Sequence, residues 1–200
     1  MEKEYFVHPS SYVDEGCEVG ENTRIWHFSH VMQGARIGCG CNIGEHVFIE
    51  SGVQLGNGVK VKNNISLYDG LVCEDDVFLG PACVFTNVIN PRSFVPRKDE
   101  FKKTVIHKGA SIGAGAVIVC GHDIGKYALI GAGAVVTKDI PDHALAYGNP
   151  ARVHGHVCQC GELLHFSEGK ARCSRCGLQY HREGDGVALD QDTDAGQAEH

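Results

Sequence analysis

Aliphatic residues recur every six positions along most of this chain. From Ile106 to Pro141 the sequence divides without a gap into IHKGAS, IGAGAV, IVCGHD, IGKYAL, IGAGAV and VTKDIP. The same frame fills the first half of the chain, where consecutive hexapeptides open at Val7, Val13, Val19, Ile25, Val31, Ile37, Ile43, Ile49, Leu55, Val61, Leu67, Cys73, Leu79 and Phe85. The fifth position of each hexapeptide is small or aliphatic throughout this first half.

A six-residue period of this kind predicts a β-helix. One short strand per hexapeptide cannot bury its aliphatic residue alone. Three such strands close a triangular coil of roughly 18 residues, and stacked coils pile the aliphatic side chains into one column. Ordinary amphipathic strands do not account for so many uninterrupted matches. We therefore predict an all-β fold, a left-handed parallel β-helix.

The hexapeptide frame is broken once. The separation between Phe85 and Ile106 is not a multiple of six, so a loop should leave the coil near residues 90–104. Its sequence, NPRSFVPRKDEFKKT, has two prolines and is rich in Lys and Arg. It is either a solvated surface insertion or a binding loop. We favour binding, because solenoids often place binding residues in insertions and a basic loop suits an anionic ligand.

Four cysteines near the C-terminus have the spacing of a structural zinc site. They form the pairs Cys158-x-Cys160 and Cys173-x-x-Cys176, and each pair is followed by glycine. We predict a small zinc ribbon with four cysteine ligands here, because so small an element has too little core to fold without a metal. The first pair is one residue tighter than usual, so the alternative ligands are His154, His156 and His165.

The composition narrows the class of protein. The net charge is −7 and no basic run offsets it, which argues against nucleic-acid binding. No apolar stretch approaches the roughly 18 residues of a membrane span. The N-terminal sequence MEKEYFVHPS is too polar for a signal peptide, so a soluble cytoplasmic protein is expected. The expected division is a β-helix domain at 1–152, a zinc ribbon at 153–182 and an acidic, disordered tail at 183–200.

The hexapeptide frame also predicts whether particular cysteines and one histidine of the repeats are buried. Four cysteines at core-type positions should be buried as free thiols, namely Cys17, Cys41, Cys73 and Cys83. His122 stands at a fifth position, so it is either a packed core histidine or a side chain that reaches a groove between subunits.

Several segments together resemble a known enzyme family. These are IWHFSH (25–30), NNISLYDG (63–70), EDDVFLGPACVFTNVINPR (74–92) and IGAGAVVTKDIPDHALAYGNPAR (130–152). They resemble the hexapeptide-repeat N-acetyltransferases of nucleotide-linked 3-amino sugars, nearest to the WlbB/WbpD type. The resemblance covers about residues 5–155.

The resemblance implies acetylation, by acetyl-CoA, of the 3-amino group of UDP-2-acetamido-3-amino-2,3-dideoxyglucuronic acid during O-antigen synthesis. It also implies a homotrimer with active sites between neighbouring β-helices. An alternative acceptor is another nucleotide-linked amino sugar, such as a dTDP-3-amino-6-deoxyhexose. A zinc-dependent γ-carbonic anhydrase and a non-catalytic β-helix assembly subunit are further alternatives.

Acetyl transfer from a thioester needs a neutral amine held near the carbonyl carbon. The pKa of an amino-sugar nitrogen should be nearer ~8 than the ~10.4 of lysine, so orientation matters more than a strong base. Asn87 in FTNVINPR is the first catalytic candidate, because its amide oxygen can accept a hydrogen bond from the amine; its alternative role is a turn cap. His27 competes as a base or oxygen donor, or it holds uridine or packs at the trimer face beside Trp26.

The remaining site predictions follow from motif position and hydrogen-bonding type. The predicted nucleotide-sugar contacts are Arg24, Tyr68, Asp69, Arg92 and Arg97. Arg97 is the first choice for the sugar carboxylate, with Arg92 second. The predicted acetyl-CoA contacts are Ala114, Gly115, Ala132 and Gly133, where small side chains let a pantetheine arm approach the backbone, and Lys138, which could meet the CoA phosphates. The geometry of the coils requires the same glycines, so their presence does not distinguish a binding role from a purely structural one.

Overall fold

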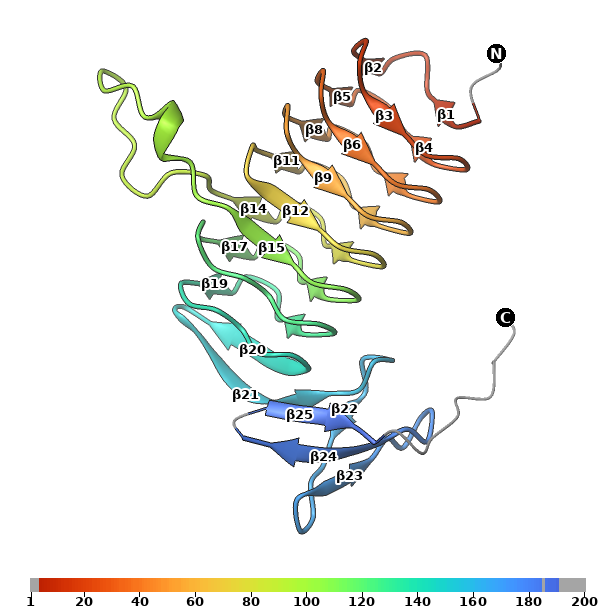
Figure 1. The fold of residues 1–200 in the computed structure, drawn as a ribbon, viewed down its shortest axis with the longest axis vertical. Helices are drawn as coiled ribbons and strands as arrows, with labels where there is room; N and C mark the ends of the chain where they lie inside the picture. The colour runs from red at the N-terminus through yellow and green to blue at the C-terminus, as the bar shows by residue number, and fades with distance from the viewer. Residues whose placement is uncertain (1–3, 185, 191–200) are drawn as a thin grey trace.

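The computed structural model describes residues 4–184 and 186–190, which form a triangular β-solenoid followed by a small antiparallel element (Figure 1). Most hexapeptides contribute a strand of two residues, and successive strands lie on three different faces. The opening residue points inward and the residue before it points outward. In β4 (Arg24–Ile25), for example, Ile25 is fully buried and Arg24 is exposed. The predicted left-handed β-helix is confirmed.

The first face is a stack of parallel strands that runs the length of the solenoid. Its strands are β1 (Phe6–Val7), β4, β7 (Asn42–Ile43), β10 (Lys60–Val61), β13 (Phe78–Leu79), β16 (Ser111–Ile112), β18 (Leu129–Ile130) and β20 (Ala144–Gly148). Two antiparallel strands extend this sheet into the C-terminal element, β21 (Ala151–Val157) and β22 (Leu163–Leu164).

The other two faces are stacked in the same way. The second face holds β2 (Tyr12–Val13), β5 (His30–Val31), β8 (Phe48–Ile49), β11 (Ser66–Leu67), β14 (Val84–Phe85), β17 (Val117–Ile118) and β19 (Val135–Val136). The third face holds β3 (Glu18–Val19), β6 (Arg36–Ile37), β9 (Gln54–Leu55), β12 (Leu71–Cys73), β15 (Thr104–Ile106) and the bridged residues Ile124 and Ile140.

Two corners of the triangle matter for the site. Corner I joins the first face to the second and comprises residues 8–11, 26–29, 44–47, 62–65, 80–83, 113–116 and 131–134. Corner II joins the second face to the third and comprises residues 14–17, 32–35, 50–53, 68–70, 86–103, 119–122 and 137–138. The second face therefore lies between the two corners.

The strand register measures the coils directly. Phe6 pairs with Arg24, so one regular coil is three hexapeptides long. Across the interruption Phe78 pairs with Ser111, and the excess over three hexapeptides equals the length of the segment predicted to leave the coil, residues 90–104. In Figure 1 this segment projects from the solenoid at corner II, and it carries one 3-10 turn, η1 (Lys98–Glu100).

The last coil departs from the predicted repeat. Leu129 pairs with Leu145, which lies two positions short of three hexapeptides. The unit VTKDIP therefore does not complete a regular turn, because the inward residue that follows Val136 is Ile140, which bridges to the preceding coil. The solenoid ends one strand after this shortened turn.

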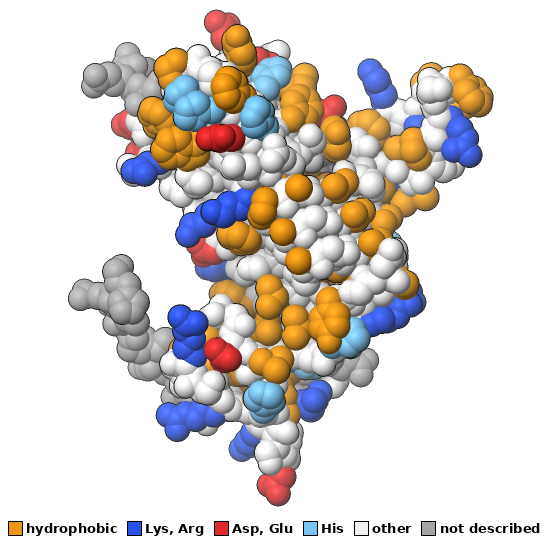
Figure 2. All heavy atoms as spheres, turned by 180° about the vertical axis from the view of Figure 1, so that it is seen from behind, with side chains coloured by type: hydrophobic (Ala, Val, Ile, Leu, Met, Phe, Trp, Pro, Cys, Tyr) orange, Lys and Arg blue, Asp and Glu red, His pale blue; other side chains and the backbone are white. Residues whose placement is uncertain are grey.

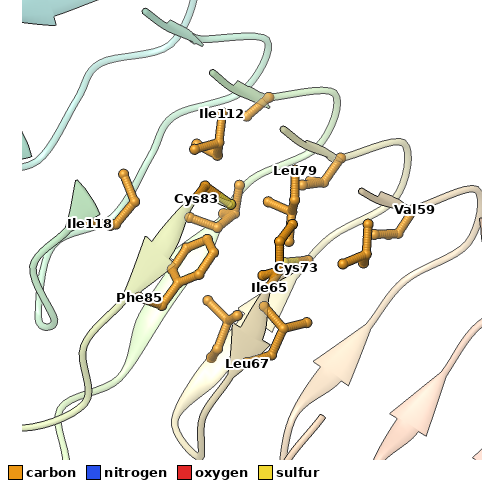
Figure 3. Packing of buried hydrophobic residues seen from close by; sticks show 14 of the residues in the cluster. Val59, Ile65, Leu67, Cys73, Leu79, Cys83, Phe85, Ile112 and Ile118 are labelled. Carbon is orange, nitrogen blue, oxygen red and sulfur yellow. The ribbon is translucent and has the colours of Figure 1, made fainter. Parts of the chain in front are cut away.

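The core is the predicted column of aliphatic side chains (Figure 3). Three of the four predicted core cysteines, Cys41, Cys73 and Cys83, are at most 2% exposed, and Cys17 packs against the column while partly exposed. Burial raises the pKa of the Cys83 thiol to about 12 and raises that of Cys73 as well. These residues therefore act as small uncharged hydrophobes at neutral pH.

His122 is not packed in this core. Its side chain is half-buried, and Nδ1 lies 3.4 Å from an oxygen of Asp139. Cys120, two residues earlier, is the buried residue of this turn. The interpretation of His122 as a core histidine is therefore wrong, and its ring lies at corner II.

The C-terminal element has a small core of its own. Its sheet consists of β23 (Lys170–Arg172), β24 (Gln179–Glu183) and β25 (Gly186–Leu189). The buried residues are Cys158, Leu164, Ala171, Cys173 and Tyr180. β25 pairs with β24, so regular structure continues past residue 183, where the acidic tail was predicted to begin. Residues 191–200 of that prediction lie outside the described residues.

One histidine joins this element to the last coil. His143 Nδ1 lies 2.9 Å from the carbonyl oxygen of Val157, and its ring centroid is 5.3 Å from that of Tyr127 and 5.2 Å from that of Tyr180. Burial lowers the pKa of His143, so the ring donates from Nδ1 as a neutral group. In the part of the chain that the structure describes, no helix is long and apolar enough to cross a membrane.

The stacked column predicts a large stability effect at one inward position. Leu79→Ala should lower the free energy of unfolding by about 2–5 kcal/mol, because it removes a fully buried side chain and leaves a cavity. Lys60→Ala, at an outward position of β10, should change it by less than about 0.5 kcal/mol. Urea unfolding at one fixed protein concentration measures both, and equal effects would contradict the column as the source of stability.

Candidate functional site

The loop is held at its neck by hydrogen bonds to the coils. The backbone N–H of Lys102 donates to the carbonyl oxygen of Asn87 at 2.8 Å. The hydroxyl oxygens of Thr86 and Thr104 accept backbone N–H groups from the next coil at 3.0 and 3.2 Å. Asn87 is therefore fixed at the point where the chain leaves corner II, and its half-buried side chain makes no hydrogen bond within the described residues.

A groove of about 440 Å³ opens beside this neck. Its lining residues are Gly52, Gln54, Asp69, Gly70, Val72, Phe101 and Lys103. Asp69 reaches this position only because residue 52 is glycine, with φ +84°; a side chain there would collide with the Asp69 carboxylate. The groove offers a carboxylate, an amide, an ammonium group and an aromatic ring, which is a suitable set for the hydroxyls and phosphates of a polar ligand.

Corner I carries a cluster of histidines in the N-terminal coils. The ring of His27 stacks on His8 with centroids 3.5 Å apart, and its Nδ1 lies 3.5 Å from a carboxylate oxygen of Glu45. This distance between Nδ1 and the carboxylate oxygen is short enough for an ion pair. The two atoms do not form a hydrogen bond, and Nδ1 has no hydrogen-bond partner among the described residues. Glu45 can therefore stabilise the ring of His27 mainly when the ring is protonated.

Phe28 extends this cluster outward. Its side chain is 60% exposed, and its backbone has φ +56°, which bulky residues rarely adopt. Its N–H donates to Ser10 Oγ at 3.0 Å, and its ring stacks on His46 with centroids 5.1 Å apart. The backbone is thus held in a strained conformation that presents an aromatic ring to solvent. Figure 2 shows histidine and hydrophobic side chains gathered at this end of the solenoid.

The predicted site residues divide between the two corners. Those on corner I are His27, Ala114, Gly115, Ala132 and Gly133. Those on corner II or its loop are Tyr68, Asp69, Asn87, Arg92, Arg97 and Lys138. Arg24 is on neither, because it points outward from β4 on the first face.

One chain does not bring the two catalytic candidates together. Asn87 is three coils beyond His27 along the solenoid, a distance of roughly 14 Å at the usual strand spacing, and it is on a different corner. The two corners are separated by the width of the second face.

The second face itself is unusually apolar for an outward surface. Its outward side chains are Tyr12, His30, Phe48, Ser66, Val84, Val117 and Val135. Tyr12 is 73% exposed and Val84 is 47% exposed. The rings of Tyr12, His30 and Phe48 contact one another in sequence, with centroids 6.5 and 6.0 Å apart. The other five outward side chains of this face are half-buried.

The two arginines of the loop have different surroundings. Arg97 donates through one guanidinium nitrogen to both carboxylate oxygens of Glu100 at 2.8 Å. Arg92 is exposed and donates to the carbonyl oxygen of Pro91 at 2.9 Å. Arg97 is thus already paired with a carboxylate of its own loop, whereas Arg92 is not.

The side chains of the four C-terminal cysteines lie together in one cluster. Their sulfur atoms all lie within 4.8 Å of one another, with Cys158 and Cys176 at 3.3 Å and Cys160 and Cys173 at 3.5 Å. Four thiolates at Zn–S distances of about 2.3 Å need S–S separations of this size, so the residues fit a tetrahedral zinc ion. None of the alternative histidine ligands is needed to complete the set.

The surroundings of these sulfurs favour the thiolate form at one position. Burial opposes ionisation of Cys173, but the backbone N–H groups of Cys176 and Arg175 point at its sulfur, and the pKa of Cys173 falls to about 6. Burial raises the pKa of Cys158 to about 12, although the hydroxyl of Tyr180 lies 3.2 Å from its sulfur. A bound cation would be required to ionise all four thiols at neutral pH.

Histidines do not converge on a second metal site. His107 pairs with Glu74 at 3.0 Å on the corner between the third and first faces, whereas His122 is on corner II. Within residues 4–184 and 186–190, the four cysteines are the only cluster with the arrangement of a metal site. His107 and His122 thus lie on different corners of the chain.

Some neighbours of the site escaped the sequence analysis. Glu45 follows His27 by one coil, so the repeat itself could have paired them. Phe101 and Lys103 line the groove through the path of the loop, which no sequence period encodes. The exposed conformation of Phe28 had no signal in the sequence.

The chain is similar to known acyltransferases. A model of the hexapeptide repeat of succinyl-transferase matches residues 34–69 and 103–138. The chain is 54% identical over 182 residues to a dTDP-3-amino-3,6-dideoxy-alpha-D-galactopyranose 3-N-acetyltransferase of Aneurinibacillus thermoaerophilus, in a match that covers 91% of this chain and 93% of that protein. It is 36% identical over 92 residues to a galactoside O-acetyltransferase of Lactococcus lactis, over 42% of this chain and 44% of that one.

Among solved structures, the fold is similar to that of AntD, an N-acyltransferase from Bacillus cereus crystallised with dTDP and 3-hydroxybutyryl-CoA. The TM-score is 0.51 with 18% sequence identity, over 75% of this chain and 78% of that one. At this identity the likeness concerns the fold alone.

Proposed function

The chain belongs to the hexapeptide-repeat N-acetyltransferases of nucleotide-linked amino sugars, and we propose that its acceptor is the 3-amino group of a dTDP-linked 3-amino-3,6-dideoxyhexose. The observation that carries this proposal is the 54% identity to the Aneurinibacillus enzyme across nine-tenths of both chains. The donor is acetyl-CoA. The dTDP-deoxysugar was the alternative at the sequence level, and it replaces the UDP-linked amino-glucuronate that the resemblance first implied.

The loop does not select an acceptor by charge. Arg97 pairs with Glu100 through one guanidinium nitrogen, so its other N–H groups and the exposed Arg92 could still meet a carboxylate. The proposed acceptor therefore rests on the identity to the Aneurinibacillus enzyme. The groove beside the loop still offers Asp69 and Lys103 to the hydroxyls and phosphates of a nucleotide sugar.

A trimer that packs around the second face would complete the site. Corner I and corner II flank that face, so a threefold arrangement would set corner I of one chain against corner II of the next. His27 of one chain and Asn87 of the next would then line one groove, still three coils apart along its length. The exposed Tyr12 and Val84, and Phe94 on the loop at 81% exposure, provide apolar surface for such contacts.

The reaction joins the sugar nitrogen to the acetyl carbon. The neutral amine attacks the thioester carbonyl, the C–N bond forms, the C–S bond breaks, and CoA leaves as a thiolate that ends as the thiol. The amine nitrogen loses one proton in the process. The protein must therefore aim the amine lone pair and provide a path for that proton.

Asn87 is suited to the first task. Its backbone carbonyl already closes the neck of the loop, so the turn does not need its side chain as a cap. The amide oxygen is free to accept a hydrogen bond from the amine and to direct the lone pair to the carbonyl carbon.

His27 is suited to the second task. The three-coil offset keeps its imidazole out of direct contact with an amine held by Asn87, so it would receive the proton at the far end of a path along the groove. The carboxylate of Glu45 at 3.5 Å would stabilise the imidazolium that forms. The stacked ring of His8 fixes the orientation of His27.

Substrate preference tests the acceptor. With acetyl-CoA, the purified protein should acetylate a dTDP-3-amino-3,6-dideoxyhexose with a kcat/KM at least about 10-fold above that for the UDP-3-amino-glucuronate, because its 54%-identical relative is an acetyltransferase of a dTDP-linked sugar of this kind. Release of free CoA thiol measures both rates. Preference for the UDP sugar would overturn the proposed acceptor while retaining the family.

Two substitutions separate the catalytic roles. Asn87→Ala should lower kcat by about 10²-fold and leave the dissociation constant of acetyl-CoA unchanged, since the interaction forms only with the amine. His27→Gln should also lower kcat, because the proton then loses its acceptor at the end of the path. His107→Gln, at a histidine on the corner between the third and first faces, is the control. Normal turnover by Asn87→Ala or His27→Gln would remove that residue from the mechanism.

We also propose that the four cysteines hold a structural zinc ion, with all four positions filled and none open for catalysis. The purified protein should contain one zinc per chain, and Cys176→Ser should abolish it and make the segment after residue 157 sensitive to protease. Cys39→Ser, at an exposed coil cysteine, is the control. Elemental analysis and limited proteolysis are the measurements; a metal-free protein with a resistant C-terminal element would refute the proposal.

A further inference from the structure

The cysteine cluster is linked to the solenoid by a column of three aromatic rings. The ring of Tyr180 lies edge-on to that of His143, with centroids 5.2 Å apart and planes at 69°, and His143 stacks on Tyr127 at 5.3 Å and 24°. Tyr127 in turn lies over Gly109, where an added side chain would collide with its ring. These last three residues all have left-handed backbones, with φ +59°, +56° and +69°, on the corner between the third and first faces. The column therefore continues from the C-terminal element across three successive coils.

The outer end of the column contacts the cysteine cluster. Tyr180 is fully buried, and its hydroxyl oxygen accepts the backbone N–H of Gln159 at 3.0 Å and lies 3.2 Å from the sulfur of Cys158. Because the oxygen already accepts one hydrogen bond, the hydroxyl hydrogen is available to the sulfur. Such hydrogen bonds orient metal ligands, and a ligand held by a metal orients its donor equally. A zinc ion on the four cysteines would therefore fix the hydroxyl of Tyr180.

The inner end of the column is fixed by the hydrogen bonds of His143. Its Nδ1 donates to the carbonyl oxygen of Val157 at 2.9 Å, and its own carbonyl oxygen accepts the N–H of Val157 at 2.7 Å. The N–H of His143 donates to the carbonyl oxygen of Lys126, in the preceding coil, at 2.7 Å. Val157 directly precedes Cys158. One buried residue thus joins the last coil, the coil before it and the strand that leads to the first cysteine.

The last coil needs a support of this kind, because the stack ends with it. Its inward residues Ala144 and Ala146 are fully buried, although no further coil follows β20. Terminal repeats of a solenoid require a cap that covers their open side. In Figure 1 the C-terminal element lies against this end of the stack, and β21 joins it to β20 by antiparallel pairing. The C-terminal element is therefore the cap of the solenoid.

We propose that the cysteine cluster is a zinc-dependent latch on the last coil. With zinc bound, Tyr180 and His143 hold the coil against the stack. When zinc leaves, Tyr180 loses its fixed position, His143 loses its contacts, and the coil opens. This inference rests on the proposed zinc site and adds regulation to the proposed function, because the predicted donor contacts Ala132 and Gly133 belong to this coil. Zinc supply would then set the fraction of the protein that has an intact last coil.

Hydrogen exchange in the full-length protein tests the latch. Removal of zinc with a chelator should raise the exchange rate of the amides in residues 129–146 by at least about 5-fold, the lower end of the usual coupling between two sites. Exchange in the coils at residues 25–61 should not change. Mass spectrometry of proteolytic peptides measures both segments in one sample, and addition of zinc should restore the protection of residues 129–146.

Substitutions at the two linking residues separate coupling from packing. Tyr180→Phe keeps the ring but removes the hydroxyl, so zinc should still bind while its effect on residues 129–146 falls below about 2-fold. His143→Gly and His143→Asn both suit the left-handed backbone, but only the Asn variant keeps a donor for Val157. The Gly variant should therefore expose the last coil even with zinc bound, and the Asn variant should retain its protection. His165→Asn, at an exposed histidine of the C-terminal element, is the control.

The outcomes distinguish the latch from the proposals on which it rests. If the protein holds one zinc per chain and residues 129–146 exchange alike with and without it, the latch is wrong and the zinc site stands. Faster exchange in every coil after zinc removal would also overturn the latch, since the effect would then be a general loss of stability. A protein that takes up no zinc refutes the zinc site and the latch together. Acetylation is measured separately, so a failure of the proposed acceptor leaves the exchange result intact.

Discussion

The whole structure depends on one constraint, that an aliphatic residue must point inward every six positions. A strand of two residues has almost no stability alone, and one coil has no neighbour to cover its interior. Stacking solves both problems, since each inward residue packs against the one three hexapeptides away. The consequence for function is spatial. Inward positions are committed to the column, so the side chains available for chemistry lie at corners and on outward faces.

The places where the period fails are those where new features attach. The inserted loop leaves Phe85 and Ile106 both inward, so the column continues while the loop projects from corner II. The shortened last turn has the opposite effect and ends the stack. β20 is then left with a free edge, and β21 pairs with it in the antiparallel sense to begin the C-terminal element. Insertion and shortening thus position the loop and the cysteine site without cost to the core.

Sequence periodicity predicted what the constraint determines. The faces, the register as far as the last coil, the length of the loop and the burial of Cys73 all follow from counting in sixes. The convergence of the four cysteines followed from their spacing. Features that depend on side-chain choices outside the column did not. His122 could have faced inward by position, yet it pairs with Asp139 outside the core. The ion pair of Arg97 with Glu100 depends on a loop whose path has no period.

The division of candidates between two corners has a consequence for specificity. Corner I carries His27 and corner II carries Asn87 with the loop, so a single chain keeps these two candidates apart. The sugar would be read by the loop of one chain and the donor held along the corner of its neighbour. Loop residues can then vary with the sugar without disturbing either the column or the donor track. Arg97 illustrates this freedom, since its contact with Glu100 lies wholly within the loop and involves no residue of the column.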